Sequence, residues 1–493
     1  MKISPIALED HQILYEQVAE RLQTLITEKT LKAGDRLPSV RNLRQQLSVS
    51  TSTVLEAYRL LEDRGLITAR PQSGYYVKAT ALHLLQEPSA SAPLVQAHRV
   101  DTPLSMRLLM ATQNPAVIQL GAALPPLSHM PLNQLNRLTS KVLRENPEAA
   151  HAYSNPLGDP GLRSALAKRM LDTGCAVSPE DLLVTNGAIE AIYLSLQALT
   201  QPGDTVAVES PTYHTMLEAL KKLHLKVLTL PTHPREGISL SHLEAALRTQ
   251  SIKAIMLVSN FSNPLGICMS DVKKKQLVAL LNHYEVPLIE DDVYGELCFV
   301  GSRPKAVKAF DTEQRVIYCA SLSKTLSPGL RIGWCVAGRY QGQVASLKSV
   351  VNLGTAIAPQ LTAAAFLANG GFDRHLRQLR RAYQEQMARM QQAIADYFPQ
   401  ETRVTRPTGG HILWVEMPAE FDALALHQEA LTHNISIVPG IMFSASGSDY
   451  QNCFRLNTGI PWSDQVDQAM QTLGQLAKVQ LARHLLQLEA RDV

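Results

Sequence analysis

The sequence has few cysteines, few aromatic residues, little net charge and no long apolar run, and each scarcity excludes a class of protein. The six cysteines among 493 residues are widely scattered, with no CxxC pair and no metal-ligand spacing. We therefore expect buried, reduced thiols in a cytoplasmic protein, with neither a disulfide framework nor a metal centre.

The charge and the apolar runs also limit the possible partners. The formal net charge is only +3, from 47 basic and 44 acidic residues, so any contact with nucleic acid must be local. The N-terminal stretch MKISPIALEDHQ has no apolar signal core, and no apolar run reaches the roughly 18 residues that span a bilayer. We expect no membrane association.

What the chain does have is material for a large core, because 45% of its residues are hydrophobic and 18% are charged. At roughly 150 residues per domain, 493 residues suggest two to four domains. A stretch with a Pro/Ser/Ala-rich middle and weak periodicity, residues 80–113, separates a short head, 1–79, from a long remainder, 114–493. We predict that this stretch is a linker.

The head shows the pattern of three helices and a hairpin. Residues 13–28 place apolar side chains at helical spacing, Ser39 can cap the short helix VRNLRQQLS, and Ser50 can cap a third helix that stops at Gly65. The runs LITAR and GYYV flank PQSG and suit a β-hairpin. This order is typical of a winged helix-turn-helix.

Such a motif places the start of its second helix in the major groove of DNA. Residues 29–44 carry five basic side chains and one acidic one, which is the local positive charge that DNA requires. From these residues alone, a dimerisation or docking module is about as well supported as DNA binding. The residues predicted to meet double-stranded DNA are Arg41, Arg44, Ser50, Thr51, Ser52, Thr53, Gln72 and Gly74.

A resemblance favours DNA binding. The stretch GDRLPSVRNLRQQLSVSTSTVLEAYRLLEDRGLITARPQSGYYV resembles the DNA-binding domain of the GntR family of bacterial regulators along its whole length. Thr51 stands where that family often has arginine, and Arg44 stands where a small residue is common. The operator sequence of the family therefore does not carry over to this chain.

The remainder alternates strand-like apolar runs with helical segments. The runs are DLLVTNG, DTVAVES, KAIMLVS, VPLIEDD and RVIYCAS. This rhythm predicts an α/β domain with a mostly parallel sheet and helices on both faces. In such sheets ligands bind at the carboxyl ends of the strands, so the residues after each run are the candidates for a binding site.

Three of these strand ends carry residues that suit a flat, phosphorylated ligand. Gly187 and Ala188 open a helix after DLLVT, and a helix N-terminus binds phosphate well. Tyr213 follows VAVES and can stack on a planar ring, and Asn263 follows IMLVS with an amide at the sheet edge. Each has an ordinary alternative when taken alone, such as a core tyrosine or an Asn-Pro turn.

The last two strand ends are more specific. Asp291 and Asp292 end the run VPLIE ahead of Tyr294, and buried carboxylates need a partner such as a cationic ring nitrogen. An acidic pair at a helix start is the alternative, but it does not explain the tyrosine. Lys324 follows RVIYCAS, and a partly buried lysine can shed its proton and form a Schiff base.

Side chains that suit a phosphate surround this lysine in the sequence. They are Ser321, Ser323 and Arg331. Together the five strand ends call for a ligand with a phosphate, a flat ring, a ring nitrogen and an aldehyde. Pyridoxal 5'-phosphate has all four, so the sequence predicts it as the cofactor.

Residues 114 to about 475 resemble the fold-type I, aspartate-aminotransferase-like enzymes, and the whole chain resembles the MocR subfamily of GntR regulators. The resemblance implies a small N-terminal winged helix-turn-helix domain and a large PLP-dependent transferase fold-type I domain. It also implies that Lys324 binds the cofactor aldehyde, that Asp291 pairs with the pyridine nitrogen, and that Tyr294 and Asn263 bond the phenolic oxygen. By the same resemblance Tyr213 stacks on the ring.

Further roles follow from that resemblance alone. It assigns the phosphate to Ser321, Arg331 and the backbone at Gly187 and Ala188. Tyr153 matches a tyrosine that reaches the cofactor phosphate of a neighbouring subunit, which implies a homodimer. Arg455 matches the arginine that clamps a substrate carboxylate.

Two functions from different classes remain at this point. The first is a transcriptional regulator that senses pyridoxal phosphate or an amino compound, which acts as a small-molecule effector. The second is an active aminotransferase with an accessory N-terminal domain. The intact head and the long linker favour the regulator, because an enzyme has no evident need for a recognition helix. Retention of Lys324, Asp291 and Arg455 keeps weak or partial transaminase chemistry open.

Overall fold

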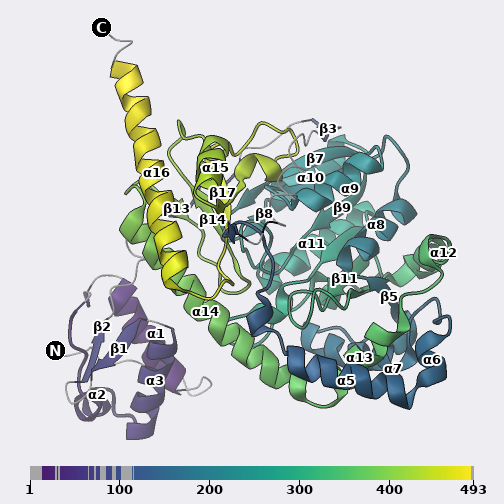
Figure 1. The fold of residues 1–493 in the computed structure, drawn as a ribbon, viewed down its shortest axis with the longest axis horizontal. Coiled ribbons are helices and arrows are strands. Elements are labelled where there is room, and N and C mark those ends of the chain that lie inside the picture. The colour runs from purple at the N-terminus through teal and green to yellow at the C-terminus, as the bar shows by residue number, and fades with distance from the viewer. Residues whose placement is uncertain are drawn as a thin grey trace. The chain divides into compact units, whose positions relative to one another are not determined.

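The computed structural model describes residues 14–27, 30–31, 34–64, 66–70, 74–77, 85–91, 96–100, 114 and 116–489. The chain divides into two compact units, Met1–Gln86 and Glu87–Val493. Figure 1 draws the first unit in purple and the second from blue to yellow. Most of the predicted linker lies outside the described residues, but residues 87–91 and 96–100 belong to the second unit.

The first unit is the predicted winged helix-turn-helix. Its elements are α1 (Leu14–Thr27), α2 (Val40–Leu47), α3 (Thr51–Asp63), β1 (Ile67–Arg70) and β2 (Gly74–Val77). The two strands pair antiparallel, with Ile67 opposite Val77. Leu22, Leu43 and Tyr58 are at most 1% exposed and hold the three helices on one core.

Serine caps begin the two helices of the turn, as the sequence predicts. The Ser39 hydroxyl accepts a hydrogen bond from the N–H of Asn42 at 3.3 Å. The Ser50 hydroxyl accepts one from the N–H of Thr53 at 3.0 Å. Each cap satisfies an N–H that has no partner inside its helix, and so fixes where the helix starts.

A nine-stranded sheet forms the centre of the second unit, with strand order β3-β7-β6-β9-β10-β11-β12-β5 and β8 paired to β7. Its strands are β3 (His98–Arg99), β5 (Leu182–Asn186), β6 (Thr205–Ser210), β7 (Lys226–His233), β8 (Gly237–Ile238), β9 (Ile252–Leu257), β10 (Leu288–Asp291), β11 (Val316–Ser321) and β12 (Ile332–Val336). The five strands from β7 to β11 along this order run parallel, whereas β12 is antiparallel to both neighbours. The predicted, mostly parallel sheet is confirmed.

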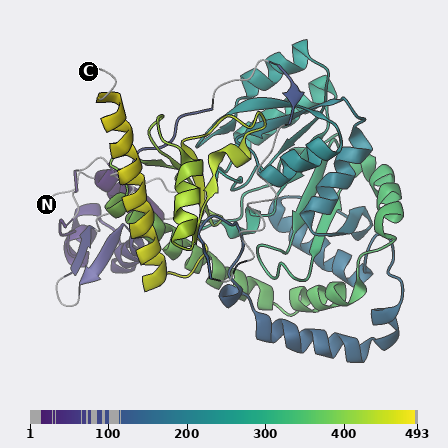
Figure 2. The ribbon, with the colours of Figure 1, turned by 45° about the horizontal axis from the view of Figure 1, so that its top comes forward.

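Helices cover both faces of this sheet (Figures 1 and 2). Ile289 and Ile317 pack into one core, and their chain neighbours Leu288 and Val316 pack into another, as strand alternation requires. The α-helices are α5 (Leu132–Glu145), α6 (Pro147–His151), α7 (Pro160–Met170), α8 (Ala188–Leu199), α9 (His214–Lys222), α10 (Leu240–Thr249), α11 (Asp271–Tyr284), α12 (Gln341–Asn352), α13 (Ile357–Ala368) and α14 (Gly371–Tyr397).

A smaller, antiparallel sheet of four strands completes the second unit. Its order is β13 (Arg403–Val404), β14 (Ile412–Glu416), β17 (Cys453–Asn457) and β16 (Val438–Pro439). The helices α15 (Ala423–Thr432) and α16 (Asp464–Glu489) pack beside it, and β4 (Ile118–Gln119) pairs with β15 (Ile435–Ser436). Figure 2 shows α16 as the long yellow helix that ends near the C-terminus.

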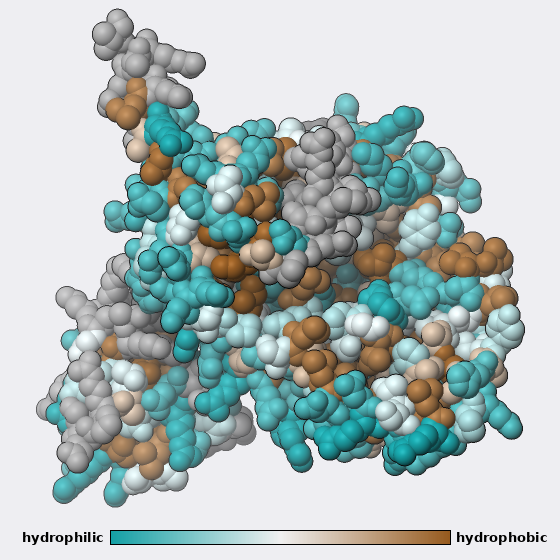
Figure 3. Space-filling view, viewed as in Figure 1, coloured by the Kyte–Doolittle hydropathy of each residue, from teal (hydrophilic) through white to brown (hydrophobic). Residues whose placement is uncertain are grey.

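The second unit exposes both polar and apolar residues on the face that is shown in Figure 3. On the face shown in Figure 3, apolar residues are interrupted by polar ones. Within the part of the chain that the structure describes, no helix has both the length and the apolar character needed to cross a membrane.

Candidate functional site

Lys324 lies three residues beyond the end of β11, at the carboxyl edge of the nine-stranded sheet. Its Nζ donates a hydrogen bond to the carbonyl oxygen of Ala123 at 2.6 Å and lies 5.8 Å from the ring centre of Tyr294. Burial, assisted by the nearby positive charge of Arg455, lowers the pKa of Lys324 to about 8. A lysine with such a pKa has a substantial neutral fraction, and the neutral amine is the nucleophile.

Asp291 ends the neighbouring strand β10 and is 4% exposed. Burial, together with the nearby charge of Asp292, raises the pKa of its carboxyl to about 7. The hydrogen bond that Asp291 accepts from the N–H of Val293, at 3.3 Å, opposes this rise only in part. None of the described side chains forms an ion pair with Asp291, so a cationic ligand would complete its environment.

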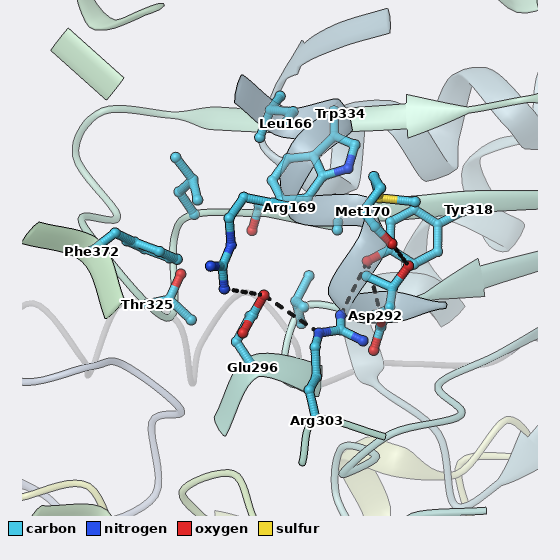
Figure 4. A pocket seen from close by; sticks show the side chains of 15 residues that line it. Leu166, Arg169, Met170, Asp292, Glu296, Arg303, Tyr318, Thr325, Trp334 and Phe372 are labelled. Atoms are coloured by element: carbon cyan, nitrogen blue, oxygen red, sulfur yellow. Dashed lines mark hydrogen bonds and ion pairs between the residues drawn. The ribbon is translucent and has the colours of Figure 1, made fainter. Parts of the chain in front are cut away.

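Asp292, by contrast, already has its partners. Its carboxylate accepts hydrogen bonds from Arg303 at 2.6 Å, from the Tyr318 hydroxyl at 3.0 Å and from the side-chain amide of Asn260 at 2.9 Å. Figure 4 shows Arg303 lying between Asp292 and Glu296. The cavity beside them has a volume of about 20 Å³, which is room for about one water molecule. This network therefore fixes the end of β10 and is not a ligand site.

Three buried polar residues lie together at the other side of the lysine. The Asn263 amide donates to the Tyr294 hydroxyl oxygen, and its carbonyl oxygen accepts from Arg455 at 2.9 Å. Arg455 also donates twice to the carbonyl oxygen of Gly121, at 2.8 and 3.1 Å. The guanidinium is 2% exposed and forms no ion pair with the described carboxylates, which favours an incoming carboxylate.

A possible phosphate site lies where α8 begins. Gly187 has a φ of +79°, and a Cβ added there would lie 2.3 Å from a terminal nitrogen of Arg331. That guanidinium donates to the carbonyl oxygen of Asn186 at 3.0 Å and to the Ser323 hydroxyl at 3.4 Å. The Ser321 hydroxyl accepts from the N–H of Ser323 at 3.4 Å. The structure thus gathers these groups at a helix N-terminus, where Ala188 is the first helical residue.

Two functional candidates escape the sequence reasoning. The Asn457 amide donates to the carbonyl oxygens of Ala122 at 2.7 Å and Leu124 at 2.9 Å. It therefore holds in place the backbone at Ala123, whose carbonyl oxygen accepts the hydrogen bond from Lys324. The Nδ1 of His411 lies 2.9 Å from the side-chain carbonyl oxygen of Asn457. The strand period of two provides a signal for Asn457, because Arg455 lies two residues before it on the same face of β17.

The two remaining tyrosines of the predicted site differ in position. Tyr213 is half-buried and directly precedes α9, at the carboxyl end of β6. Tyr153 is 93% exposed, and among the described side chains no hydrogen bond or ring contact joins it to another predicted site residue. Its role at the cofactor stays a prediction.

The structure also locates the predicted DNA-contacting residues on the first unit. Those with exposed side chains are Arg41, Arg44, Ser50, Thr51 and Ser52. Thr53 is half-buried, and its hydroxyl lies 2.8 Å from the Ser50 hydroxyl. These two hydroxyls therefore bond each other in the helix cap. Gly74 begins β2 with a φ of +103°, and Gln72 lies outside the described residues.

The fold and the site define an aminotransferase-like protein that carries a DNA-binding unit of the winged helix-turn-helix type. Class I and II aminotransferases match residues 116–473, and the gntR family of bacterial regulatory proteins matches residues 14–77. The chain belongs to both families and, by this combination, to the MocR subfamily of GntR-type regulators.

Two regulators match this chain over nearly its whole length, and a solved aminotransferase matches most of it. The chain is 41% identical to the uncharacterized HTH-type transcriptional regulator YdcR of Escherichia coli, over 95% of this chain and 99% of that protein. It is 36% identical to YjiR of the same organism, over 94% of this chain and 98% of that protein. The structure of LysN, an alpha-aminoadipate aminotransferase from Thermus thermophilus complexed with N-(5'-phosphopyridoxyl)-L-leucine, covers 78% of this chain and 96% of its own, with a TM-score of 0.72 and 29% identity.

Proposed function

We propose that this protein is a cytoplasmic, DNA-binding transcriptional regulator whose aminotransferase-like unit binds pyridoxal 5'-phosphate and senses the cofactor or an amino compound. One observation carries the proposal. A first unit with exposed hydroxyl and arginine side chains at its turn is joined to a second unit with a half-buried lysine, Lys324, whose lowered pKa suits reaction with an aldehyde. The relatives that cover nearly the whole chain are named as transcriptional regulators, which supports this reading.

The residues present fit the cofactor. Gly187 leaves no space for a side chain beside Arg331, which is the crowding expected where backbone N–H groups approach a phosphate. Asp291 is a buried carboxyl with a raised pKa and no cation paired to it among the described side chains. The LysN complex, at 29% identity, holds a phosphopyridoxyl compound in the same fold.

The protein's own side chains would perform four tasks. Lys324, with a pKa of about 8, presents about a tenth of its amine as the neutral form at pH 7. Asp291 would hold a proton on the ring nitrogen, and Asn263 would orient Tyr294 toward the phenolic oxygen. Arg455 would bind the carboxylate of an amino compound. Pyridoxal phosphate, when bound, supplies the aldehyde and an electron-withdrawing ring.

A homodimer is part of the proposal. Tyr153 is 93% exposed, and its neighbour Ser154 donates a hydrogen bond to the carbonyl oxygen of Thr355 at 2.8 Å. The chain just before Thr355 exposes Val350 by 86% and Leu353 by 60%. An exposed tyrosine next to apolar residues is the pattern of a protein interface. We expect Tyr153 to complete the partner's site in this dimer. Sedimentation of the wild type should show the dimer.

The second candidate, an active aminotransferase, is favoured by Arg455, since a buried guanidinium suits a substrate carboxylate. Both candidates can be tested on the full-length protein. Pyridoxal phosphate should give the wild type the visible absorbance of lysine-bound cofactor, and Lys324→Ala should lack it. A colourless wild type at saturating cofactor contradicts the cofactor assignment.

The same preparation separates regulator from enzyme. DNA selected by the wild type from a random double-stranded pool should be bound sequence-specifically, and steady-state transamination with amino acids should be slow or limited to a single half-reaction. Multiple turnover at ordinary enzyme rates without sequence-specific DNA binding would instead make the aminotransferase the function of this chain.

A further inference from the structure

The first five residues of the second unit, Glu87–Ser91, form a segment that we call the strap. Its sequence is EPSAS, and it directly follows Gln86, the last residue of the first unit. Such a composition is typical of a flexible loop. The strap nevertheless lies against the second unit through side-chain and backbone bonds.

One set of these bonds joins the strap to the nine-stranded sheet. The Ser91 hydroxyl accepts from the N–H of Thr232, in β7, at 2.8 Å. The N–H of Ser91 donates to the carbonyl oxygen of the same threonine at 3.3 Å. Glu87 forms an ion pair with Arg235, in the turn that follows β7.

A second set joins the strap to the four-stranded sheet. The Ser89 hydroxyl accepts from Arg403, in β13, at 3.2 Å, and the N–H of Ser89 donates to the carboxylate of Glu416, in β14. Ser91 also hydrogen-bonds the hydroxyl of Tyr450 through its side chain. Five residues of chain thus bridge the two sheets of the unit.

The strap is connected to the cofactor site through one serine. The Ser210 hydroxyl lies 2.7 Å from the Tyr450 hydroxyl, and the N–H of Ser210 donates to the Thr232 hydroxyl at 3.1 Å. Both partners of Ser210 are partners of the strap serine Ser91. Ser210 ends β6 and stands three residues before Tyr213, the residue assigned to the cofactor ring.

A ligand that joins the cofactor to an amino acid would bridge the same two sheets. Asp291 ends β10 of the nine-stranded sheet and Lys324 lies just beyond β11 of the same sheet, whereas Arg455 belongs to β17 of the four-stranded sheet. The strap and such a ligand would each bind across the interface between the two sheets. Each would favour the arrangement of the sheets that it binds best, so each would affect the binding of the other. The effect is reciprocal by thermodynamic necessity.

We propose that the strap is the element by which ligand binding in the aminotransferase-like unit is passed to the DNA-binding unit. A ligand that engages both Asp291 and Arg455 tightens the strap on the two sheets, and the chain that leads from Gln86 is held accordingly. The inference rests on the proposed function, since it takes the cofactor site and the DNA-binding unit as given there.

Hydrogen exchange on the full-length protein tests the first step of the proposal, the coupling of the ligand to the strap, because the N–H groups of Ser89 and Ser91 are both bonded in the strap. Two probes are compared, N-(5'-phosphopyridoxyl)glycine and pyridoxamine 5'-phosphate, of which only the first has a carboxylate for Arg455. The first should slow exchange at these two amides by about 5- to 150-fold, the usual range of coupling between sites, and the second by less. Equal exchange with and without either bound probe would overturn the proposal.

Variants of the strap provide the reciprocal measurement. The double variant Glu87→Gln, Ser91→Ala should weaken binding of N-(5'-phosphopyridoxyl)glycine by the same factor by which that probe slowed exchange. The matched control is Glu385→Gln, which removes an exposed ion pair with Arg381 on α14. Unchanged affinity in the double variant contradicts the strap alone. Failure of the wild type to bind either probe contradicts the proposed function instead.

Discussion

Replacing Asp291 by asparagine should stabilise the cofactor-free second unit and weaken its hold on pyridoxal phosphate. The carboxyl is 4% exposed, and burial raises its pKa from the usual 3.8 to about 7. Asparagine keeps an oxygen that can accept from the N–H of Val293 but carries no charge. The substitution therefore removes the cost of ionising a buried group while preserving its local contact.

The magnitude and the sign both follow from this pKa. Each tenfold change in proton affinity corresponds to about 1.4 kcal/mol, so a rise from 3.8 to about 7 makes the ionised carboxyl cost about 4 kcal/mol of folding free energy above pH 7. Between pH 4 and 7 the folded state keeps the proton that the unfolded state has lost, so wild-type stability falls as the pH rises. The gain from Asp291→Asn should grow from about 2 kcal/mol at pH 5 to about 4 kcal/mol at pH 8.

Urea unfolding followed by tryptophan fluorescence measures this gain for the second unit alone, because Trp334, Trp414 and Trp462 all lie in it. Asp464→Asn, at an exposed position at the start of α16, is the matched control and should show no such growth with pH. With saturating cofactor present the gain should shrink by about 1.4 to 2.7 kcal/mol, since loss of a charged hydrogen bond weakens binding by about 10- to 100-fold. A gain equal at pH 5 and pH 8, or a destabilised variant at pH 8, would refute the reasoning.

Three further predictions concern the phosphate site, the lysine and the DNA-binding unit. Gly187→Ala should displace Arg331 and raise the dissociation constant of pyridoxal phosphate by about 10- to 100-fold, while phosphate-free pyridoxal is little affected in the same spectroscopic titration. The rate at which Lys324 captures pyridoxal phosphate should rise with pH and level off above about 8, as its neutral form accumulates; a rise that continues above pH 9 contradicts the lowered pKa. Ser50→Ala should destabilise α3 by about 1 kcal/mol, seen as faster hydrogen exchange, whereas Thr51→Ala should weaken DNA binding and leave that exchange unchanged.

Local patterns in the sequence predict much of the architecture and place several residues of the candidate site. The serine caps at Ser39 and Ser50 and the five strand runs are confirmed, because each depends on neighbours within a few residues. Lys324 and Asp291 were predicted for a similar reason, since parallel strands bring their carboxyl ends to one edge. The structure places Asp291 at the end of β10 and Lys324 three residues beyond the end of the adjacent strand β11.

The contacts that the sequence does not predict join residues far apart along the chain. Two partners of the strap, Thr232 and Arg403, lie 141 and 314 residues away from the serines that they bond, so the composition EPSAS suggests only a linker. The pairing of Asp292 with Arg303 spans only 11 residues, but it too is not predicted, because it follows from no period of strand or helix. For Asn457 the sequence predicts one of the two features. The strand period predicts the face on which it lies, but nothing in the sequence predicts its hydrogen bonds to Ala122 and Leu124.

The central claim is that the cofactor site controls DNA binding, and one measurement tests it most directly. The dissociation constant of the full-length protein for its selected DNA is measured by fluorescence anisotropy at fixed salt, with and without saturating pyridoxal phosphate. We expect at least a fivefold difference for the wild type and none for Lys324→Ala. Equal dissociation constants for a wild type whose absorbance shows bound cofactor would contradict the claim.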